Sequence, residues 1–411
     1  MSTYARYFNT YAEYEASDAY NASYPIVVYI GSDKVIATNT TNAPLITLAR
    51  QKSWIPSTRD YITVADAEAV TTINISGNTT LINFREFRYF TNVTSIPEDG
   101  FYYCTNLEYI ELPKTITSIG VRAFCGCTHL KLINIPDSVT TISHHSFVEC
   151  SELQHITIPK SVTSIGYKSF YNCISLSSVN LYANITYISQ ELFRECHSLV
   201  DVNIPNTVTS IESEAFSHCT SLKTISIPNT VTTLGAKCFT YCTSLERIGI
   251  PAATTSLGQA MFLGCKYLQE IIFYPASMAA QLNNGNITLF PIDIFSECET
   301  IKTLTVPYNV TTIGSYAFTN CTSIKDITLS PQTSSIDNGA FYNCNQLTDL
   351  RISRSTPPTI NVNSQPFSDA NNLIRIYIPQ NTTAAYESAW RSKLNSNVKF
   401  IEFTYNYNYS V

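Results

Sequence analysis

The stretch from Cys104 to Arg122, CTNLEYIELPKTITSIGVR, decides the fold, because most of the chain repeats it. Ala123 and Phe124 complete the pattern, and Cys127 starts it again 23 residues later. The cysteine position recurs at regular steps and, after one longer step, resumes at Cys150, Cys173, Cys196, Cys219, Cys242, Cys265, Cys298, Cys321 and Cys344. A fixed period of this length predicts a solenoid, in which each repeat is one coil stacked on the next.

Each repeat contains two short extended runs and a turn. Ile110 and Leu112 alternate, so they share one face of a short strand. Pro113 lacks an N–H and ends that strand, and residues 116–119 start a second extended run. Gly120 predicts a turn of the kind that often has positive φ. A recurring phenylalanine predicts an aromatic spine at Phe147, Phe170, Phe193, Phe216, Phe239, Phe262, Phe295, Phe318 and Phe341.

The consensus L-x-x-I-x-I-P-x-x-V-T-x-I-G-x-x-A-F-x-x-C resembles the BspA-like leucine-rich repeats. Residues 159–173, PKSVTSIGYKSFYNC, and residues 228–242 match it closely, and the resemblance covers about residues 81–380. It implies a curved, right-handed, β-rich leucine-rich repeat solenoid with a parallel sheet along one face. It also implies adhesion or recognition at a surface, and no enzyme activity, although a fold alone does not carry a function with it.

Residues 1–80 precede the repeats and predict a small α+β region for attachment or capping. Residues 25–37 favour a β-hairpin around Gly31-Ser32-Asp33, and residues 45–54 and 64–70 favour two helices. The opening FNTYAEYEASDAY resembles the short attachment segments of phage structural proteins. An irregular first coil then begins with Leu81 at the cysteine position and Phe84, Phe87 and Tyr89 at apolar positions.

Residues 381–411 predict a C-terminal cap and tail that follow the solenoid at residues 81–380. Residues 384–394 favour a helix with Trp390 on its apolar side, and residues 398–403 favour a closing strand. The last residues, TYNYNYSV, favour a free or partner-bound end.

Composition narrows the possible partners. The net charge is −6 and 14% of residues are charged, so no nucleic-acid partner is expected. No apolar run is long enough to span a membrane, and the opening residues lack the apolar segment of a signal peptide. Thirteen cysteines cannot all pair, and eleven share one repeat position, so we expect them to pack as small buried side chains without a metal or cofactor.

The concave sheet face is the expected binding surface, since solenoids bind partners along such faces. Side chains that alternate with the buried pair of each strand should point outward there, and a polar face that only keeps the sheet soluble is the competing interpretation. The charged and aromatic candidates on this face are Tyr109, Glu111, His155, Asp201, Arg247, Glu270, Asp326, Asp349, Arg351, Arg375 and Tyr377.

The step from Cys265 to Cys298 is 33 residues, and its extra ten residues lie within residues 274–291. Insertions of this kind form loops that are often on the binding side, and a tolerated surface excursion is equally compatible with the sequence.

Catalytic motifs are lacking, so no enzyme is expected. His144 and His145 are adjacent, so they should point in different directions in an extended segment. The other histidines fall at different repeat positions and should not form one cluster.

The sequence therefore predicts a non-enzymatic binding or adhesion protein with a protein or glycan of a cell surface as its ligand. The first hypothesis is a phage virion component (tail, fibre or capsid decoration) that recognises a host and contacts other virion proteins through residues 1–80. The second is a cell-surface or secreted adhesin of a bacterium or protist. The third is an intracellular protein-interaction scaffold, which free thiols would permit.

Overall fold

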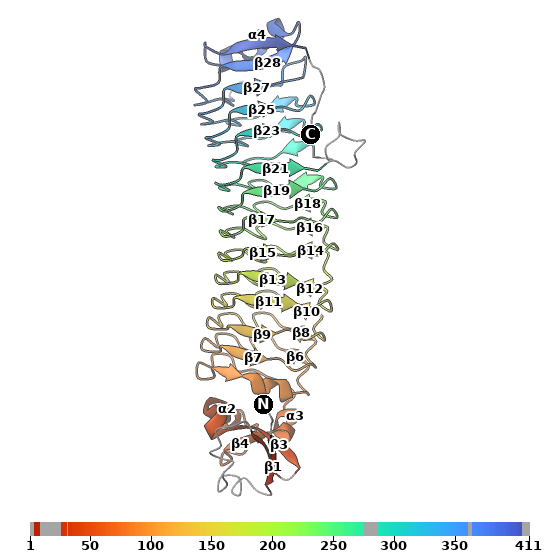
Figure 1. Ribbon diagram of the computed structural model, residues 1–411, viewed down its shortest axis with the longest axis vertical. Helices are drawn as coiled ribbons and strands as arrows, with labels where there is room; N and C mark the ends of the chain where they lie inside the picture. Colours follow the sequence, from red (N-terminus) through yellow and green to blue (C-terminus); the bar gives the residue numbers. More distant parts are fainter. Residues whose placement is uncertain (1–3, 9–25, 31, 275–286, 361–363, 405–411) are drawn as a thin grey trace. The chain divides into compact units, whose positions relative to one another are not determined.

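The computed structural model describes residues 4–8, 26–30, 32–274, 287–360 and 364–404. The chain divides into two compact units, Met1–Ser169 and Phe170–Val411. Within each unit, Figure 1 shows short strands stacked in two columns, with one strand of each column per coil. The predicted β-rich leucine-rich repeat solenoid is confirmed, whereas the predicted boundaries at residues 80 and 380 stay predictions.

The first unit begins with a four-stranded sheet in the order β1-β2-β3-β4. Its strands are β1 Tyr4–Phe8, β2 Ile26–Ile30, β3 Asp33–Thr38 and β4 Tyr61–Thr63. β2 and β3 are antiparallel, so the predicted hairpin is confirmed. The segment resembling phage attachment sequences lies almost entirely outside the described residues.

Two helices pack in this region, as the sequence predicts. They are α2 Asn39–Gln51 and α3 Val64–Ala69. Each has a capping box, at Thr38 and Thr63, in which the threonine hydroxyl accepts from the backbone N–H three residues later. α2 is kinked at Asn42, whose side-chain oxygen accepts from the N–H of Leu45. The buried face of α2 is Leu45, Ile46, Leu48 and Ala49.

The first coil starts three residues out of the expected register. β5 Asn83–Phe84 pairs with β7 Tyr109–Glu111 so that Phe84 lies beside Ile110, which places Leu81 beside Leu107. Leu81 therefore takes the leucine position of the repeat and not the cysteine position. The turn η1 Arg85–Tyr89 follows, and Phe84, Phe87 and Phe90 fill the core. Tyr89, predicted at an apolar position, is half-buried, and its hydroxyl accepts from Lys34 Nζ at 3.0 Å.

The remaining coils of the first unit carry two columns of parallel strands. The longer strands are β7 Tyr109–Glu111, β9 Leu132–Asn134 and β11 His155–Ile158, and their pairing is interrupted between β9 and β11. The shorter strands are β6 Ser95–Ile96, β8 Ser118–Ile119, β10 Thr141–Ile142 and β12 Ser164–Ile165. Their register is one repeat per coil, so that Ile110 lies beside Ile133 and Ile119 beside Ile142.

The second unit continues the same pattern. Its longer strands are β13 Ser178–Leu181, β15 Asp201–Val202, β17 Thr224–Ile225, β19 Arg247–Ile250, β21 Glu270–Phe273, β23 Thr303–Thr305, β25 Asp326–Thr328 and β27 Asp349–Arg351. Its shorter strands are β14 Tyr187–Ile188, β16 Ser210–Ile211, β18 Thr233–Leu234, β20 Ser256–Leu257, β22 Leu289–Phe290, β24 Thr312–Ile313 and β26 Ser335–Ile336.

The C-terminal cap closes the second unit as predicted. β28 Arg375–Pro379 and β29 Lys399–Phe403 extend the sheet that contains β27, and between them lie α4 Thr383–Trp390 and the short helix η3 Arg391–Lys393. Trp390 is fully buried, and its indole N–H donates to the carbonyl of Pro358 at 2.9 Å. The tail beyond residue 404 lies outside the described residues.

The recurring cysteine and phenylalanine are joined from one coil to the next. The thiol of Cys127 donates to the carbonyl of Phe101 at 3.1 Å, and the thiol of Cys219 donates to Phe193 at 3.2 Å. The phenylalanine rings stack, with centroids 5.5 Å apart for Phe216 and Phe239. The predicted aromatic spine and the buried packing of the cysteines are thus confirmed. A cysteine suits this position because it is small and apolar and still satisfies a buried carbonyl.

The expected role of Gly120 needs correction. Its φ is not positive; a side chain there would bring Cβ within 2.7 Å of the Glu98 N and the Ile96 O of the preceding coil. The left-handed residues lie elsewhere in the turn, at the two positions that flank the phenylalanine. In one coil these are His145 (φ 59°) and Glu149 (φ 60°). Gly120 is therefore required by the close approach of two coils.

Candidate binding surface

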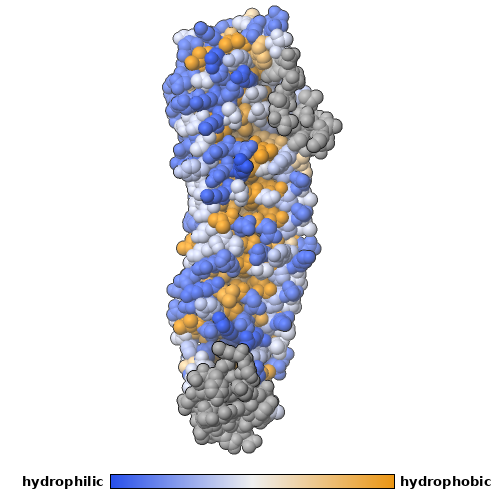
Figure 2. Space-filling model, viewed as in Figure 1, coloured by the Kyte–Doolittle hydropathy of each residue, from blue (hydrophilic) through white to orange (hydrophobic). Residues whose placement is uncertain are grey.

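The outward face of the longer strands carries the predicted binding residues. Within each strand the burial alternates, and His155–Ile158 is exposed, buried, exposed and buried in turn. Tyr109, Glu111 and His155 lie on this face in the first unit, and the other eight candidates lie on longer strands of the second unit. Within each unit, the face seen in Figure 2 is hydrophilic at its margins, and hydrophobic residues lie between them.

Some outward side chains link coils instead of facing a partner. The Asn134 Oδ1 accepts from the N–H of Leu112 at 2.7 Å, and its Nδ2 donates to the carbonyl of the same residue. Asn203 makes the same pair of bonds with Leu181. Part of the polar character of this face therefore belongs to the stacking of the coils, as the competing interpretation of a merely polar face expects.

In the first unit, Glu111 and Tyr109 contact two arginines of η1. The Arg88 Nη1 lies 2.6 Å from the Glu111 Oε2, and the Arg85 guanidinium lies 5.2 Å from the centre of the Tyr109 ring. Arg88 also donates to the Tyr89 hydroxyl. Both arginines went unnoticed in the sequence, although Arg88 and Glu111 are opposite charges one repeat apart.

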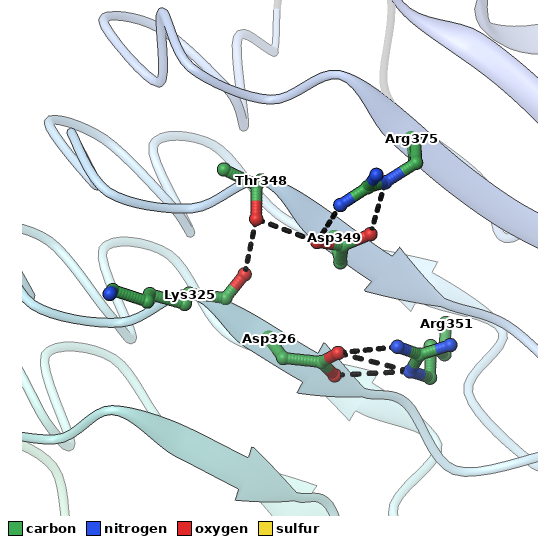
Figure 3. Close-up of polar contacts among 6 residues, drawn as sticks. All are labelled: Lys325, Asp326, Thr348, Asp349, Arg351 and Arg375. Atoms are coloured by element: carbon green, nitrogen blue, oxygen red, sulfur yellow. Dashed lines mark hydrogen bonds and ion pairs between the residues drawn. The ribbon is translucent and has the colours of Figure 1, made fainter.

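In the second unit five candidates form one group, the C-terminal charge cluster: Asp326, Asp349, Arg351, Arg375 and Tyr377. Figure 3 shows the four charged residues of this cluster. The register places Asp326 beside Asp349 on neighbouring strands, where like charges repel. Each carboxylate is balanced by its own arginine. Arg375 donates to Asp349 from Nε and Nη2 at 2.6 and 2.8 Å, and Arg351 Nη2 donates to Asp326 at 2.7 Å.

The members of this cluster differ in exposure. Asp349 is only 8% exposed, so it is not the outward binding residue that the sequence predicts; it anchors Arg375. Thr348, which the sequence did not single out, donates to Asp349 at 2.6 Å. The hydrogen bonds from Arg375 hold the pKa of Asp349 at about 2, against the opposing effect of burial. Arg351 lies over the Tyr377 ring at 4.5 Å, so two planar groups are fixed on rigid strands.

Arg247 and Glu270 form a separate pair on β19 and β21. Their side chains are 3.0 Å apart, and both line an open hollow of about 620 Å³ together with Glu246, Gln269, Thr300, Lys302, Thr303 and Ser323. Asp201 lies exposed on β15. The insertion at residues 274–291 was the other candidate binding element, and its residues 275–286 lie outside the described residues.

Residues that could carry metal or acid–base chemistry are dispersed. Among the described residues, no group of three or more His, Cys, Asp and Glu side chains could hold a metal ion. His144 and His145 do not point apart as expected, because they lie in a turn and both rings contact Tyr167. The centres of their rings lie 4.4 and 4.6 Å from the centre of the Tyr167 ring. Throughout the described residues, no helix is long and apolar enough to cross a membrane.

Known proteins resemble the chain over most of its length. A family model described as the BspA type leucine rich repeat region (6 copies) matches residues 94–208, 186–284 and 288–409. A crystal structure of a leucine-rich repeat protein from Bacteroides ovatus is 25% identical, with a TM-score of 0.59, and the match covers 76% of this chain and 82% of that one. No curated protein matches the chain.

Two other solved structures are similar at lower scores. The pneumococcal vaccine antigen PcpA is 18% identical over 77% of this chain and 78% of its own, with a TM-score of 0.47. A leucine rich cell surface protein from Faecalibacterium prausnitzii is 23% identical over 68% of this chain and 87% of its own, with a TM-score of 0.37. Because the family model covers well over half of the sequence, the chain belongs to the BspA-type leucine-rich repeat family, whose solenoids are typically non-enzymatic binding scaffolds.

Proposed function

We propose that this chain recognises a protein on a cell surface through the outward face of its longer strands, with the C-terminal charge cluster as the principal contact. The observation that supports this is the placement of Arg351, whose guanidinium is held between the Asp326 carboxylate and the Tyr377 ring. Arginine and tyrosine dominate the energetics of many protein interfaces. Here both are fixed before binding, so little side-chain entropy is lost on association.

Binding of the purified chain to intact cells tests this proposal. We expect Arg351→Gln to weaken binding about tenfold or more, as for an interface arginine. Lys266→Gln is the matched control, since it also removes one exposed cation from an ion pair, with Glu299 at 3.0 Å. Equal binding by the wild type and the Arg351 variant would exclude the C-terminal charge cluster as the contact.

Treatment of the cells distinguishes the two ligand classes that the sequence allows. Protease treatment should abolish binding, and periodate treatment, which oxidises glycans, should leave it intact. The reverse pattern would identify a glycan as the ligand.

For the setting we propose the surface of a phage virion, with a bacterial cell surface as the alternative. The family favours a cell-surface or secreted protein. The virion setting draws on the N-terminal module of β1–β4, α2 and α3, which precedes the coils and suits attachment to another chain. Fractionation of the native protein separates these settings. Recovery on particles, with residues 1–80 cross-linked to another protein, supports the virion setting. Recovery in the cell envelope excludes that setting. Recovery as a cytosolic monomer excludes both settings and leaves the intracellular scaffold.

A further inference from the structure

At the start of the longer strands, neighbouring coils are joined by opposite charges at several points. In the first unit the Nζ of Lys131 lies 3.0 Å from the Oε2 of Glu108, and in the second the Nζ of Lys223 lies 4.0 Å from the Oε1 of Glu246. All four residues occupy the same repeat position, four residues after the cysteine. This alternation is expected, because like charges side by side on neighbouring strands are destabilising.

The alternation fails at two points in the five-stranded sheet of β23, β25, β27, β28 and β29. Lys302 and Lys325 occupy that same repeat position in successive coils, and the N–H of Lys325 donates to the carbonyl of Lys302 at 2.8 Å. At the other end of the sheet, Arg375 lies beside Lys399 in the register of β28 and β29. Lys302, Lys325 and Lys399 are exposed, and among the described residues none of the three forms an ion pair. Two pairs of like charges are therefore kept side by side, although this arrangement costs stability.

These three unpaired lysines border the C-terminal charge cluster. Lys325 directly precedes Asp326, and in Figure 3 its side chain extends away from both aspartate–arginine pairs. Because each aspartate of the cluster is balanced by its own arginine, Lys302, Lys325 and Lys399 leave the outward side of this sheet with a surplus of positive charge. The whole chain has the opposite balance, with a net charge of −6. The sheet is about 19 Å wide, since it has four strand spacings of about 4.8 Å each.

We propose that the partner protein contacts this side of the sheet with an acidic segment, whose carboxylates meet Lys302, Lys325 and Lys399. This inference rests on the proposed function and names the chemistry of the partner at the C-terminal charge cluster. The paired arginines and Tyr377 form the centre of the contact, and the lysines form its margin, where complementary charge accelerates encounter and disfavours positively charged partners. Carboxylates placed there also relieve the repulsion within each pair of like charges.

A fluorescent all-glutamate peptide of about eight residues, the length of a strand, is the probe. Fluorescence anisotropy measures its binding to the full chain. We expect saturable binding at about 20 mM salt that is lost at about 0.5 M, because salt screens exposed charges. A triple variant, Lys302→Gln with Lys325→Gln and Lys399→Gln, should weaken this binding about tenfold or more, since it removes the charges that meet the carboxylates.

The matched control is a second triple variant, Lys52→Gln with Lys114→Gln and Lys160→Gln. It removes the same charge at exposed lysines of the first unit, so it should bind the peptide as the wild type does. Equal binding by the two triple variants, or equal binding of an all-lysine peptide of the same length, would overturn the proposal.

Binding to intact cells separates this inference from the proposed function. If Arg351→Gln weakens cell binding and the Lys302, Lys325 and Lys399 variant does not, the contact stands and the acidic partner is excluded. If that triple variant loses the peptide while Arg351→Gln binds cells as the wild type does, the proposed contact is excluded and the binding of acidic segments still holds. Displacement of the chain from cells by a sulfated polysaccharide but not by the glutamate peptide would also overturn the proposal, because the partner's charge would then be sulfate.

Discussion

At the scale of single residues, the cysteine of the repeat acts as a hydrogen-bond donor inside the core, as in Cys127, Cys219 and Cys321. All thirteen cysteines are buried thiols. Burial raises the pKa of Cys104, Cys242 and Cys344 to about 12 and that of Cys125 to about 11. Since the thiolate is the reactive form, these thiols should be inert in the folded protein.

Alkylation measures this inertness directly. Iodoacetamide at pH 8 should leave the folded chain unmodified over minutes, and mass spectrometry should show thirteen additions after unfolding in guanidinium chloride. If one thiol reacts first, it should be Cys125, which is 9% exposed. Rapid alkylation of Cys219 in the folded protein would contradict the packing described above.

Gly120 gives a second test at this scale. Gly120→Ala should lower the free energy of unfolding by about 1–3 kcal/mol, the usual cost of forcing an atom into a packed site. Gly77→Asn is the control, because Gly77 has a positive φ of 72°, which Asn tolerates, and open space around it. Urea denaturation measures the free energy of unfolding of both variants. Equal values would contradict the explanation that a Cβ at position 120 clashes with the preceding coil.

At the scale of strands and helices, opposite charges one repeat apart lie side by side. Arg88 and Glu111 are such a pair, and so are Arg247 and Glu270. Because neighbouring coils stack in register, this spacing could have predicted the ion pairs from the sequence alone. The burial of Asp349 could not be predicted in that way, because it depends on how Arg375 and Thr348 fold over its carboxylate.

The cap helix α4 depends on one carboxylate for its first turn. The Glu402 Oε1 accepts from the Thr383 hydroxyl at 2.7 Å and from the N–H groups of Thr382 and Thr383. These bonds lower the pKa of Glu402 to about 2, below its usual 4.5. The resulting stabilisation is present above the unfolded-state pKa and is lost as the pH falls through about 4.5 to 2.

Glu402→Gln should therefore reduce the acid sensitivity of the cap. In a Trp54→Phe background, the fluorescence of Trp390, which lies in α4, reports unfolding of the cap between pH 6 and pH 2. We expect a flatter pH profile in the variant than in the wild type. Identical profiles would show that the carboxylate charge contributes nothing to the helix.

At the scale of the whole molecule, stability should be local, because each coil contacts only its neighbours. The chain has two tryptophans, and each unit contains one, Trp54 in the first and Trp390 in the second. Phe239→Ala removes a fully buried ring and should cost about 3–5 kcal/mol. Each tryptophan is followed alone: Trp390 in a Trp54→Phe background, and Trp54 in a Trp390→Phe background. Phe239→Ala should shift the unfolding midpoint reported by Trp390 more than the midpoint reported by Trp54.

Phe124→Ala provides the reciprocal experiment, since Phe124 is equally buried and lies in the first unit. It should shift the unfolding midpoint reported by Trp54 more than the midpoint reported by Trp390. If both substitutions shift both signals equally, the two units unfold as one cooperative body.

Most of the architecture could be predicted from the sequence, because the period of 23 residues and the alternation of Ile110 and Leu112 fix the coils. The register of the first coil could not be predicted, since the three-residue offset of Leu81 from its expected position depends on how η1 bends the chain. The interruptions of strand pairing between β15 and β17 and between β21 and β23 could not be predicted either, because only the second coincides with a longer step in the repeat. The candidate surface was placed on the correct strands, and its use as a binding site stays a prediction.

The bond between a repeat cysteine and the phenylalanine carbonyl of the preceding coil also has an evolutionary consequence. In most of the described repeats, a coil offers the same acceptor to the coil after it and the same donor to the coil before it, as Cys127 and Cys219 show. Recombination between two gene segments that encode equivalent positions would add or delete one coil without leaving a broken bond at the junction. The length of such a protein can therefore change in whole coils, and a ligand-binding face can lengthen or shorten while its chemistry is kept.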